Sequence, residues 1–277
     1  MNNTCGPLLS VFTLSYNHEK FIAQAIDSAL SQKTNFTYEI VIGDDASTDL
    51  TPRIVSEYAN QHPHVIRPIL HKKNLGPGNN VLSVFQKCRG KYIAFLEGDD
   101  FWSDTFKLQK QVDFLEANTD YTICFHNTEE RYDNTERASW LYCKPTQKID
   151  STIYDLAYKN FIPTCSAVFR AGLFSELPDW FPKSKMGDWP IHLLNAKHGK
   201  IRYIPHVMGV HRIHDQGIWS PLSQEEMIAH ICQTYDYLIN HFSDDRALVE
   251  HLIAGKQKLT EQKKATGLLE KIRRIFN

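Results

Sequence analysis

The 277-residue sequence has no long apolar run and no excess of charge of either sign. Nowhere do about 18 apolar residues follow one another, so no membrane-spanning helix is expected. With 31 Lys and Arg against 32 Asp and Glu, the formal net charge is -1, which gives no basis for nucleic acid as a partner. The opening residues MNNTCGPLLSVFTL carry no basic segment before a short apolar run. No signal peptide is therefore expected, and a cytoplasmic location is predicted.

Paired cysteines are also missing, because the six cysteines are scattered and form no C-x-x-C pattern. This distribution predicts reduced thiols rather than a disulfide framework or a zinc site. His206, His211 and His214 are an alternative zinc set, but their spacing matches no standard structural zinc site.

The first half of the chain alternates between short apolar runs and segments of helical periodicity. The expected strands are LLSVFTL (8–14), YEIVIG (38–43), VIRPIL (65–70) and KYIAFLEG (91–98). A helix is expected over about 18–32, where apolar side chains recur on one face, and another begins near Pro52, which suits a first helical turn. The alternation predicts parallel βαβ units and an open α/β sheet.

The second half follows a looser pattern. Helices are expected over about 105–118 and 152–159 and from about 188, and strands over 121–126, 164–169 and 200–207. Region 127–150 is polar and is expected to be irregular, and the sequence is typical of helices from about Ser223 onward. We therefore expect one domain over residues 1–220 and a helical extension over 221–277.

Acidic residues collect where two of the expected strands end. DDASTD follows the second strand and EGDD the fourth, and ligands of open α/β sheets bind at the carboxyl ends of strands. Carboxylates this close raise one another's pKa unless a cation or hydrogen-bond donors compensate. EGDD therefore indicates a site for a metal-bound diphosphate. The alternative is a charged turn in which Asp99 or Asp104 caps the next helix.

Five stretches together resemble the family 2 glycosyltransferases, whose nucleotide-binding fold is called GT-A. They are SVFTLSYNHEKFIAQAIDSALSQ, IVIGDDASTDLT, NLGPGNNV, YIAFLEGDDFW and GDWPIHLLNAKHGKIRYI, in the family's order and at roughly its spacing. The resemblance covers about residues 8–220. It implies a GT-A α/β fold for transferring sugars from nucleoside diphosphates, with a mostly parallel open sheet, flanking helices and here a C-terminal helical tail. It also implies an inverting enzyme of bacterial surface-glycan synthesis, such as that of lipopolysaccharide or capsule.

The resemblance assigns several residues to the donor, a nucleotide sugar and most simply a UDP-sugar. Tyr16 would lie beside the base and Asp45 would accept a hydrogen bond from it, with Asp44 alongside. A local turn held by the two aspartates is the alternative. In the NLGPGNN stretch Lys73 or Asn74 would lie near the base, although a plain loop has the same composition.

The EGDD stretch occupies the family's D-x-D position. Asp99 would bind Mn2+ or Mg2+, Glu97 would contact the ribose or a metal-bound water, and Gly98 between them would also be part of the donor site. The first acid is Glu rather than Asp, which lengthens the side chain without removing the charge. Farther along, His214 would be a second metal ligand and Arg212 would contact the diphosphate.

The matching position for the family's general base is Asp188, at the start of a helix in MGDWPIHLL. Gly187 stands where the family often has Glu. In-line attack by the activated hydroxyl would invert the anomeric centre without a covalent enzyme intermediate. The alternative makes Asp188 only a helix N-cap, since Pro190 follows just inside the helix.

The acceptor would be a hydroxyl of a glycan or lipid-linked oligosaccharide, contacted by regions 127–150 and 176–189. Aromatic residues there would stack on sugar rings or else belong to the core: Trp140, Tyr142, Trp180 and Trp189. Two other classes stay open. A sugar nucleotidyltransferase would carry a Gly-rich loop with Arg and Lys after the first strand, which SYNHEKF lacks, and a non-catalytic carbohydrate-binding relative would not need the acids.

The chain ends in GLLEKIRRIFN, which has apolar residues on one helical face and basic residues on the other. A basic amphipathic helix over 266–277 would allow peripheral contact with the inner face of the plasma membrane. Packing of this helix on its own domain or on a second copy is the alternative.

Overall fold

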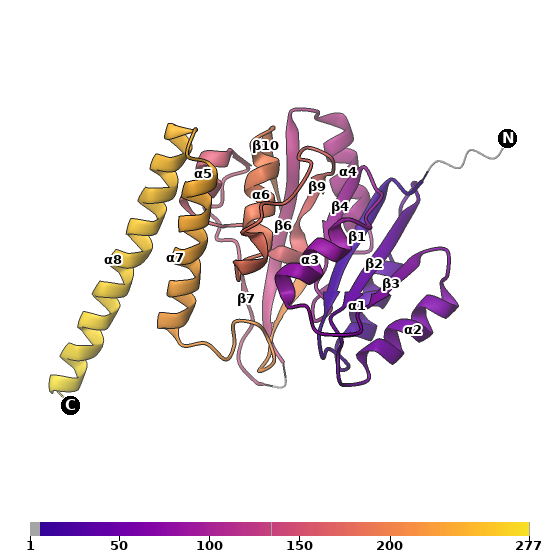
Figure 1. The fold of residues 1–277 in the computed structure, drawn as a ribbon, viewed down its shortest axis with the longest axis horizontal. Helices are drawn as coiled ribbons and strands as arrows, with labels where there is room; N and C mark the ends of the chain where they lie inside the picture. The colour runs from indigo at the N-terminus through magenta and orange to yellow at the C-terminus, as the bar shows by residue number, and fades with distance from the viewer. Residues whose placement is uncertain (1–5, 134, 277) are drawn as a thin grey trace.

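The computed structural model describes residues 6–133 and 135–276, and the side chains of residues 6–133 and 135–261. One sheet crosses the molecule in the strand order β3-β2-β1-β4-β9-β6-β10-β5, with helices on both faces (Figure 1). The strands are β1 (Leu9–Ser15), β2 (Tyr38–Asp44), β3 (Ile66–Leu70), β4 (Tyr92–Phe95), β5 (Phe101–Trp102), β6 (Tyr121–Tyr132), β7 (Trp140–Leu141), β8 (Asp150–Ser151), β9 (Val168–Arg170) and β10 (Lys200–Ile213). The helices are α1 (Ile22–Leu30), α2 (Thr51–Gln61), α3 (Pro77–Phe85), α4 (Lys107–Ala117), α5 (Ile153–Tyr158), α6 (Asp188–Ala196), α7 (Gln224–His241) and α8 (Arg246–Phe276).

The main strands of the sheet share one direction. β1 pairs in parallel with β2 and β4, β2 with β3, and β6 with β10. β9 lies antiparallel between β4 and β6, so β6 runs in the same direction as β4. The carboxyl ends of these strands therefore meet at one edge of the sheet, the lower edge in Figure 1, which we call the carboxyl edge. The expected open α/β sheet is confirmed.

Helices bury both faces of the sheet, which explains why its central strands are continuous apolar runs. On one face, α1, α2 and α4 contribute core residues such as Ile22, Val55 and Leu108. On the other face, α3 and α6 contribute residues such as Val84 and Ile191.

The strand expected over 164–169 is shorter and later than its apolar composition indicates. Residues Thr164–Ser166 form a 3₁₀ turn, and only Val168–Arg170 join the sheet as β9. The turn follows Pro163, whose carbonyl accepts a 2.6 Å hydrogen bond from the Ser166 hydroxyl. This local bond offers the backbone an alternative to strand pairing, so the expectation was wrong for the first residues of the run.

The region expected to be irregular, 127–150, begins with a strand. β6 continues to Tyr132 and carries the two-residue strand β7 on its edge. The polar residues are buried because they have partners: Asn127 Oδ1 accepts from the backbone N–H of Cys143 (2.7 Å), and Thr128 donates to Glu130 (3.0 Å). Apolar periodicity cannot reveal a strand stabilised in this way.

Strand β10 extends beyond the predicted end at 207 and continues to Ile213. Its register against β6 shifts between Ile204 and Val207, around Pro205, and again before Gly209. Bulges of this kind interrupt the period-2 pattern without ending the strand. His211 and Arg212 therefore lie on a strand at the carboxyl edge rather than in a loop.

The C-terminal helices pack on the domain. Gly255 of α8 lies so close to the carbonyl of Tyr158 in α5 that a side chain would not fit there. The hydroxyl of Tyr235 in α7 donates to the same carbonyl at 2.8 Å, and its ring meets Trp189 edge to face. The structure describes the backbone of 266–276 as part of α8, but the side chains of these residues and residue 277 lie outside the described part, so the membrane-contact helix stays a prediction. The boundary between 220 and 221 also stays a prediction.

Candidate active site

The acidic turn Glu97–Asp100 joins β4 to β5 at the carboxyl edge. The backbone N–H of Gly98 donates to the carbonyl of Leu14 at the end of β1 (2.9 Å). A Cβ on Gly98 would lie 2.8 Å from that carbonyl oxygen and 2.9 Å from Nδ1 of His18. Only glycine allows this close approach, which sets the turn directly against the segment that follows β1.

Asp99 lies between two histidines. Its Oδ2 is 3.0 Å from Nε2 of His214 and 3.6 Å from Nε2 of His18. One ligand atom from each of these three residues lies within 4.8 Å of the other two. Burial raises the pKa of Asp99, but the neighbouring His18 and His214 outweigh it and lower the pKa to about 2. Burial lowers the pKa of His18, which favours the neutral imidazole that binds metals.

This trio fits a divalent cation, since one carboxylate and two imidazoles converge within coordination range. The structure brings together the two predicted metal ligands, Asp99 and His214. His18 was not predicted, because the sequence placed it in the first turn of a helix. In the structure α1 begins at Ile22, and the N–H groups of Phe21 and Ile22 both donate to the carbonyl of His18, which lies in a turn at the carboxyl edge.

Arg212 supports the acidic turn from the last part of β10. Its backbone N–H donates to Oδ1 of Asp100 (2.9 Å), and its guanidinium donates to the backbone carbonyl of Asp99 (2.6 Å) and to Gln24. The guanidinium lies over the rings of Phe21 and Phe101, 5.0 Å and 4.7 Å from their centroids. A diphosphate contact for Arg212 stays a prediction.

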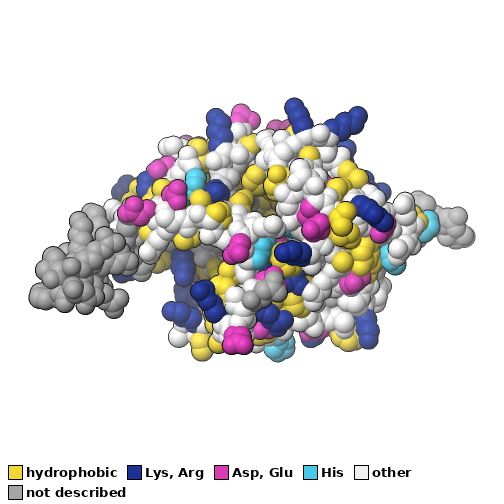
Figure 2. Space-filling view, turned by 90° about the horizontal axis from the view of Figure 1, so that it is seen from below, with side chains coloured by type: hydrophobic (Ala, Val, Ile, Leu, Met, Phe, Trp, Pro, Cys, Tyr) yellow, Lys and Arg dark blue, Asp and Glu magenta, His cyan; other side chains and the backbone are white. Residues whose placement is uncertain are grey.

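The carboxylates of this region repel one another. Burial and the charges of Asp99, Asp100 and Asp188 raise the pKa of Glu97 well above its ordinary value. Burial, together with Asp99, likewise raises the pKa of Asp100 to about 7. A cation would relieve this repulsion. Acidic, histidine and basic side chains gather at the centre of this face in Figure 2, which views the carboxyl edge from below.

His211 compensates part of the charge. Its Nδ1 lies 2.6 Å from Glu130 Oε2. Burial lowers its pKa, but the carboxylates of Asp100 and Glu130 outweigh this effect and raise the pKa to about 10. His211 therefore contacts Glu130 and His214 contacts Asp99, so the alternative zinc set does not come together among the described residues.

The two aspartates after β2 have different roles. Asp44 is buried and accepts hydrogen bonds from the Ser15 hydroxyl (3.2 Å) and the Ser47 backbone N–H (3.1 Å), so it holds the local turn given above as the alternative. Asp45 accepts a 2.7 Å bond from the backbone N–H of Leu75 and so ties this turn to the NLGPGNN loop.

The remaining residues predicted to bind the base lie at the rim. Tyr16 is 45% exposed at the carboxyl end of β1. Lys73 and Asn74 are exposed in the loop before α3, and the Asn74 side chain accepts from the backbone N–H of Gly76 (2.9 Å). They are accessible to a ligand at this edge, and their contacts with a base stay predictions.

Asp188 is the first residue of α6, and its side chain is half buried. Gly187 is the N-cap and no side chain caps the helix, so the alternative of Asp188 as an N-cap is wrong. Its Oδ2 accepts hydrogen bonds from Nδ2 of Asn160 (3.2 Å) and from the hydroxyl of Thr164 (3.1 Å), neither of which was predicted. Thr164 contacts Asp188, and the carbonyl of the next residue, Cys165, accepts a 2.8 Å hydrogen bond from Nε1 of Trp102, just after the acidic turn, so the candidate base lies beside that turn. The contribution of Asp188 to the raised pKa of Glu97 agrees with this placement.

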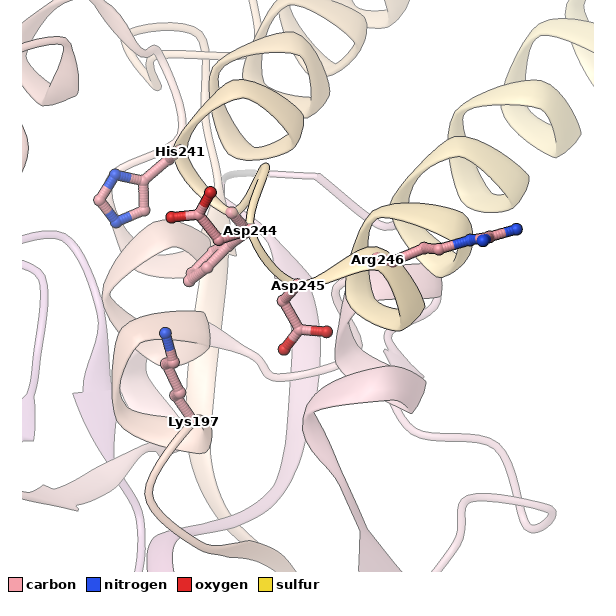
Figure 3. A pocket seen from close by; sticks show the side chains of 6 residues that line it. Lys197, His241, Asp244, Asp245 and Arg246 are labelled. Atoms are coloured by element: carbon pink, nitrogen blue, oxygen red, sulfur yellow. The ribbon is translucent and has the colours of Figure 1, made fainter.

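A separate cavity of about 530 Å3 lies among α6, α7 and α8 (Figure 3). Its lining mixes both signs of charge: Lys197, His241, Phe242, Asp244, Asp245 and Arg246. Lys197 precedes the first residue of β10, so the cavity lies at the opposite edge of the sheet from the acidic turn and is not part of the site.

Two curated relatives illustrate the similarity. An uncharacterised protein of Mycobacterium tuberculosis is 39% identical over 212 residues, covering 76% of this chain and 60% of the relative. The putative teichuronic acid biosynthesis glycosyltransferase TuaG of Bacillus subtilis is 31% identical over 165 residues, covering 58% of this chain and 61% of the relative. The chain thus spans about 60% of the length of these relatives.

Two solved structures share the fold. The S. aureus TarS 1–349 structure in complex with UDP-GlcNAc gives a TM-score of 0.62 at 18% identity, covering 88% of this chain and 71% of TarS. A mannosyltransferase from Pyrobaculum calidifontis, in complex with GDP-Man and Mn2+, gives 0.59 at 16% identity, covering 98% of this chain and 81% of that protein.

No helix within the described residues is both long enough and apolar enough to cross a membrane. The sequence model of the family described as glycosyl transferase family 2 matches residues 10–177, which include the turns after β1, β2 and β4 described above. The arrangement of those turns along a GT-A sheet agrees with this match, and the chain therefore belongs to glycosyl transferase family 2.

Proposed function

We propose that this protein is a metal-dependent, inverting glycosyltransferase. It moves a sugar from a nucleotide sugar, most simply a UDP-sugar, to a hydroxyl of a glycan or lipid-linked acceptor in surface polysaccharide synthesis. The observation that carries the proposal is that Asp188 and the acidic turn meet at one edge of the sheet. Support for the donor comes from TarS, whose structures contain UDP and UDP-GlcNAc. Support for the pathway class comes from TuaG.

The donor would lie along the carboxyl edge. Tyr16, Asp45 and the loop containing Lys73 and Asn74 would contact the nucleotide. Glu97 would contact the ribose or a metal-bound water, and Gly98 would lie beside the donor. Asp44 would act through the turn that it holds. Arg212 already contacts the acidic turn, and its charge would favour an anionic diphosphate beside it.

The cation would be held by Asp99, His214 and His18. When bound, it neutralises negative charge that develops on the leaving diphosphate. Because two of the three ligands are imidazoles, we propose Mn2+ rather than Mg2+, which prefers oxygen ligands. The Mn2+ in the Pyrobaculum mannosyltransferase structure supports this choice.

The step carried out by a side chain of this protein is the removal of the acceptor proton by Asp188. The carboxylate takes the proton of the acceptor hydroxyl as that oxygen attacks the anomeric carbon. The bond between this carbon and the diphosphate oxygen breaks, and its electron pair leaves with the diphosphate. General base catalysis of this kind contributes about 10²–10⁴-fold to a rate.

The four aromatic residues considered for the acceptor fall into two groups. Trp189 is buried and belongs to the core, and Trp180 stacks on Tyr237 of α7. Trp140 and Tyr142 are 44% and 40% exposed on and directly after β7. We propose that only these two contact an acceptor sugar.

The two other classes of protein, a sugar nucleotidyltransferase and a non-catalytic carbohydrate-binding relative, have less support. SYNHEKF still lacks the Gly-rich basic loop of a nucleotidyltransferase. A non-catalytic carbohydrate-binding relative would not need a candidate base in the same site as a three-residue cation set.

The test is nucleoside diphosphate release from a panel of nucleotide sugars, with Mn2+, Mg2+ or EDTA. We expect release from one donor, strongest with Mn2+, and loss of release in Asp99→Asn and Asp188→Asn. Asp236→Asn is a matched control, because Asp236 pairs only with Lys256 on the surface of α7 and α8 among the contacts described for it. Release that survives EDTA, or that Asp188→Asn retains, would reject the mechanism.

A further inference from the structure

We infer that Asn160 and Thr164 are positioning residues for the base: they hold Oδ2 of Asp188, so that Oδ1 is the oxygen that takes the acceptor proton. This inference rests on the proposed function. It concerns the loop between α5 and β9, which lies outside the acidic and helical motifs that identified the site.

Two donors converge on one oxygen. The Asn160 amide and the Thr164 hydroxyl both donate to Asp188 Oδ2, at 3.2 Å and 3.1 Å. These are the hydrogen bonds described for the Asp188 side chain. A carboxylate held through a single oxygen keeps its plane oriented, while its second oxygen stays available to a substrate hydroxyl.

The donors are themselves fixed. Oδ1 of Asn160 accepts from the backbone N–H of Ile162 (3.2 Å), so the opposite end of the amide, Nδ2, points to Asp188. Thr164 starts the 3₁₀ turn after Pro163, and its neighbours Ile162 and Cys165 are buried in the core. The loop is thus anchored between the two donors, at Ile162, and directly after the second donor, at Cys165. The side chains of both donors are half buried.

The arrangement matters because Asp188 lies near other carboxylates, as the raised pKa of Glu97 indicates. Hydrogen bonds donated to the ionised form stabilise the charge that a general base must carry. They also remove rotational freedom from the carboxylate before the substrate arrives, which lowers the entropic part of the barrier. In the step itself, the proton moves from the acceptor oxygen to Oδ1, the new bond to the anomeric carbon forms, and the diphosphate leaves with the electron pair of the broken bond.

The test uses Thr164→Val and Asn160→Asp in the full chain. Valine has the shape of threonine but no donor. Aspartate at 160 keeps an oxygen for the N–H of Ile162 but places a second carboxylate against Asp188. Thr164→Ser restores the hydroxyl, and Asn118→Asp is the matched amide control, because the Asn118 amide donates to Phe114 at the opposite edge of the sheet.

We measure kcat and KM with the donor found in the panel, and the Kd of UDP with Mn2+ by calorimetry. We expect kcat to fall about ten- to a hundredfold in Thr164→Val, the equivalent of one hydrogen bond to a charged group, and further in Asn160→Asp. KM for the donor and the Kd of UDP should change less than about twofold. Thr164→Ser and Asn118→Asp should keep kcat close to that of the wild-type protein.

Other results overturn the inference. Thr164→Val and Asn160→Asp with unchanged kcat, while Asp188→Asn is inactive, would reject the positioning role alone. A fall in kcat that Thr164→Ser shares with Thr164→Val would show that the loop has only a structural role. A fall in kcat that is matched by weaker UDP binding would show the same. A wild-type protein that turns over no donor would instead reject the proposed function, and an active Asp188→Asn would reject Asp188 as the base. Either result would reject the inference as well.

Discussion

Replacing Gly98 by alanine tests the link between the packing of the acidic turn and the cation set, the three residues His18, Asp99 and His214 that would hold the metal. An added Cβ would lie 2.8 Å from the carbonyl oxygen of Leu14, 2.9 Å from Nδ1 of His18 and 3.0 Å from Cδ1 of Ile22. The Leu14 carbonyl belongs to β1 and is held by the sheet. The His18 ring is the part that can move, and its Nε2 faces Asp99.

The magnitude has two parts. Overpacking of this size costs about 1–3 kcal/mol of folding stability, which lowers the Tm of a protein of this size by several degrees. Disturbing the orientation of a metal-binding histidine weakens metal affinity by about 10–100-fold. We therefore expect Gly98→Ala to fold, to melt a few degrees lower and to bind Mn2+ about 10–100-fold more weakly.

Calorimetric titration with Mn2+ and thermal melting without metal measure the two effects. Gly6→Ala is the control, because no atom of the part of the chain that the structure describes lies within 4 Å of its added Cβ. Unchanged Mn2+ affinity in a variant with lowered Tm would show that His18 does not bind the cation. Unchanged affinity together with unchanged Tm would refute the packing argument itself.

Three further predictions concern other parts of the chain. Glu39→Gln should lower the free energy of unfolding by about 2–3 kcal/mol, because the buried Glu39 carboxylate accepts a 2.6 Å hydrogen bond from Arg89. The Arg89 side chain is partly exposed, so water weakens this ion pair and keeps the loss from being larger. Burial raises the pKa of Glu39, but hydrogen bonds from Arg89 and other donors outweigh burial and lower the pKa. The contribution of Glu39 to stability is therefore present above the pKa of the unfolded state and is lost as the pH falls through the lower pKa of the folded state. Trp140→Ala should raise the KM for the acceptor about tenfold and leave the Kd of the donor unchanged if, as we propose, the exposed ring stacks on an acceptor sugar. Deleting 266–277 should reduce co-sedimentation with anionic liposomes.

Each of these has its own control and contrary outcome. Glu57→Gln removes an exposed i,i+4 partner of Arg53 and should be nearly neutral, so equal urea midpoints for it and Glu39→Gln would contradict the first prediction. Leu141→Ala changes the residue beside Trp140, and an equal effect of both on acceptor KM would argue against stacking. Co-sedimentation that is unchanged by the deletion would reject membrane contact.

The sheet and the position of the site follow from sequence because apolar runs and strand-end acids are local patterns. The runs that became β1, β2 and β4 are buried on both faces and therefore continuous, and the acids after β2 and β4 had to lie at one edge. The family resemblance was confirmed by the match over residues 10–177.

What the sequence did not reveal depends on contacts between distant segments. His18 sits beside an apolar helical pattern, which concealed that it lies in a turn. In the sequence, Asn160 and Thr164 are ordinary polar loop residues. Their contact with Asp188 of α6 depends on the folded position of the loop before β9. The buried polar end of β6 requires partners such as Cys143, which no periodicity of β6 itself can indicate.

The cation set also has a consequence for folding. His18 follows the first strand of the sheet and His214 follows β10, so a cation held by both would join the beginning and the end of the chain segment that forms the sheet. A ligand that binds only the folded state adds to its stability by mass action, by about 2.7 kcal/mol at a concentration of 100 Kd. The melting temperature would then depend on metal concentration, and the folded population of this protein would rise and fall with the supply of the metal.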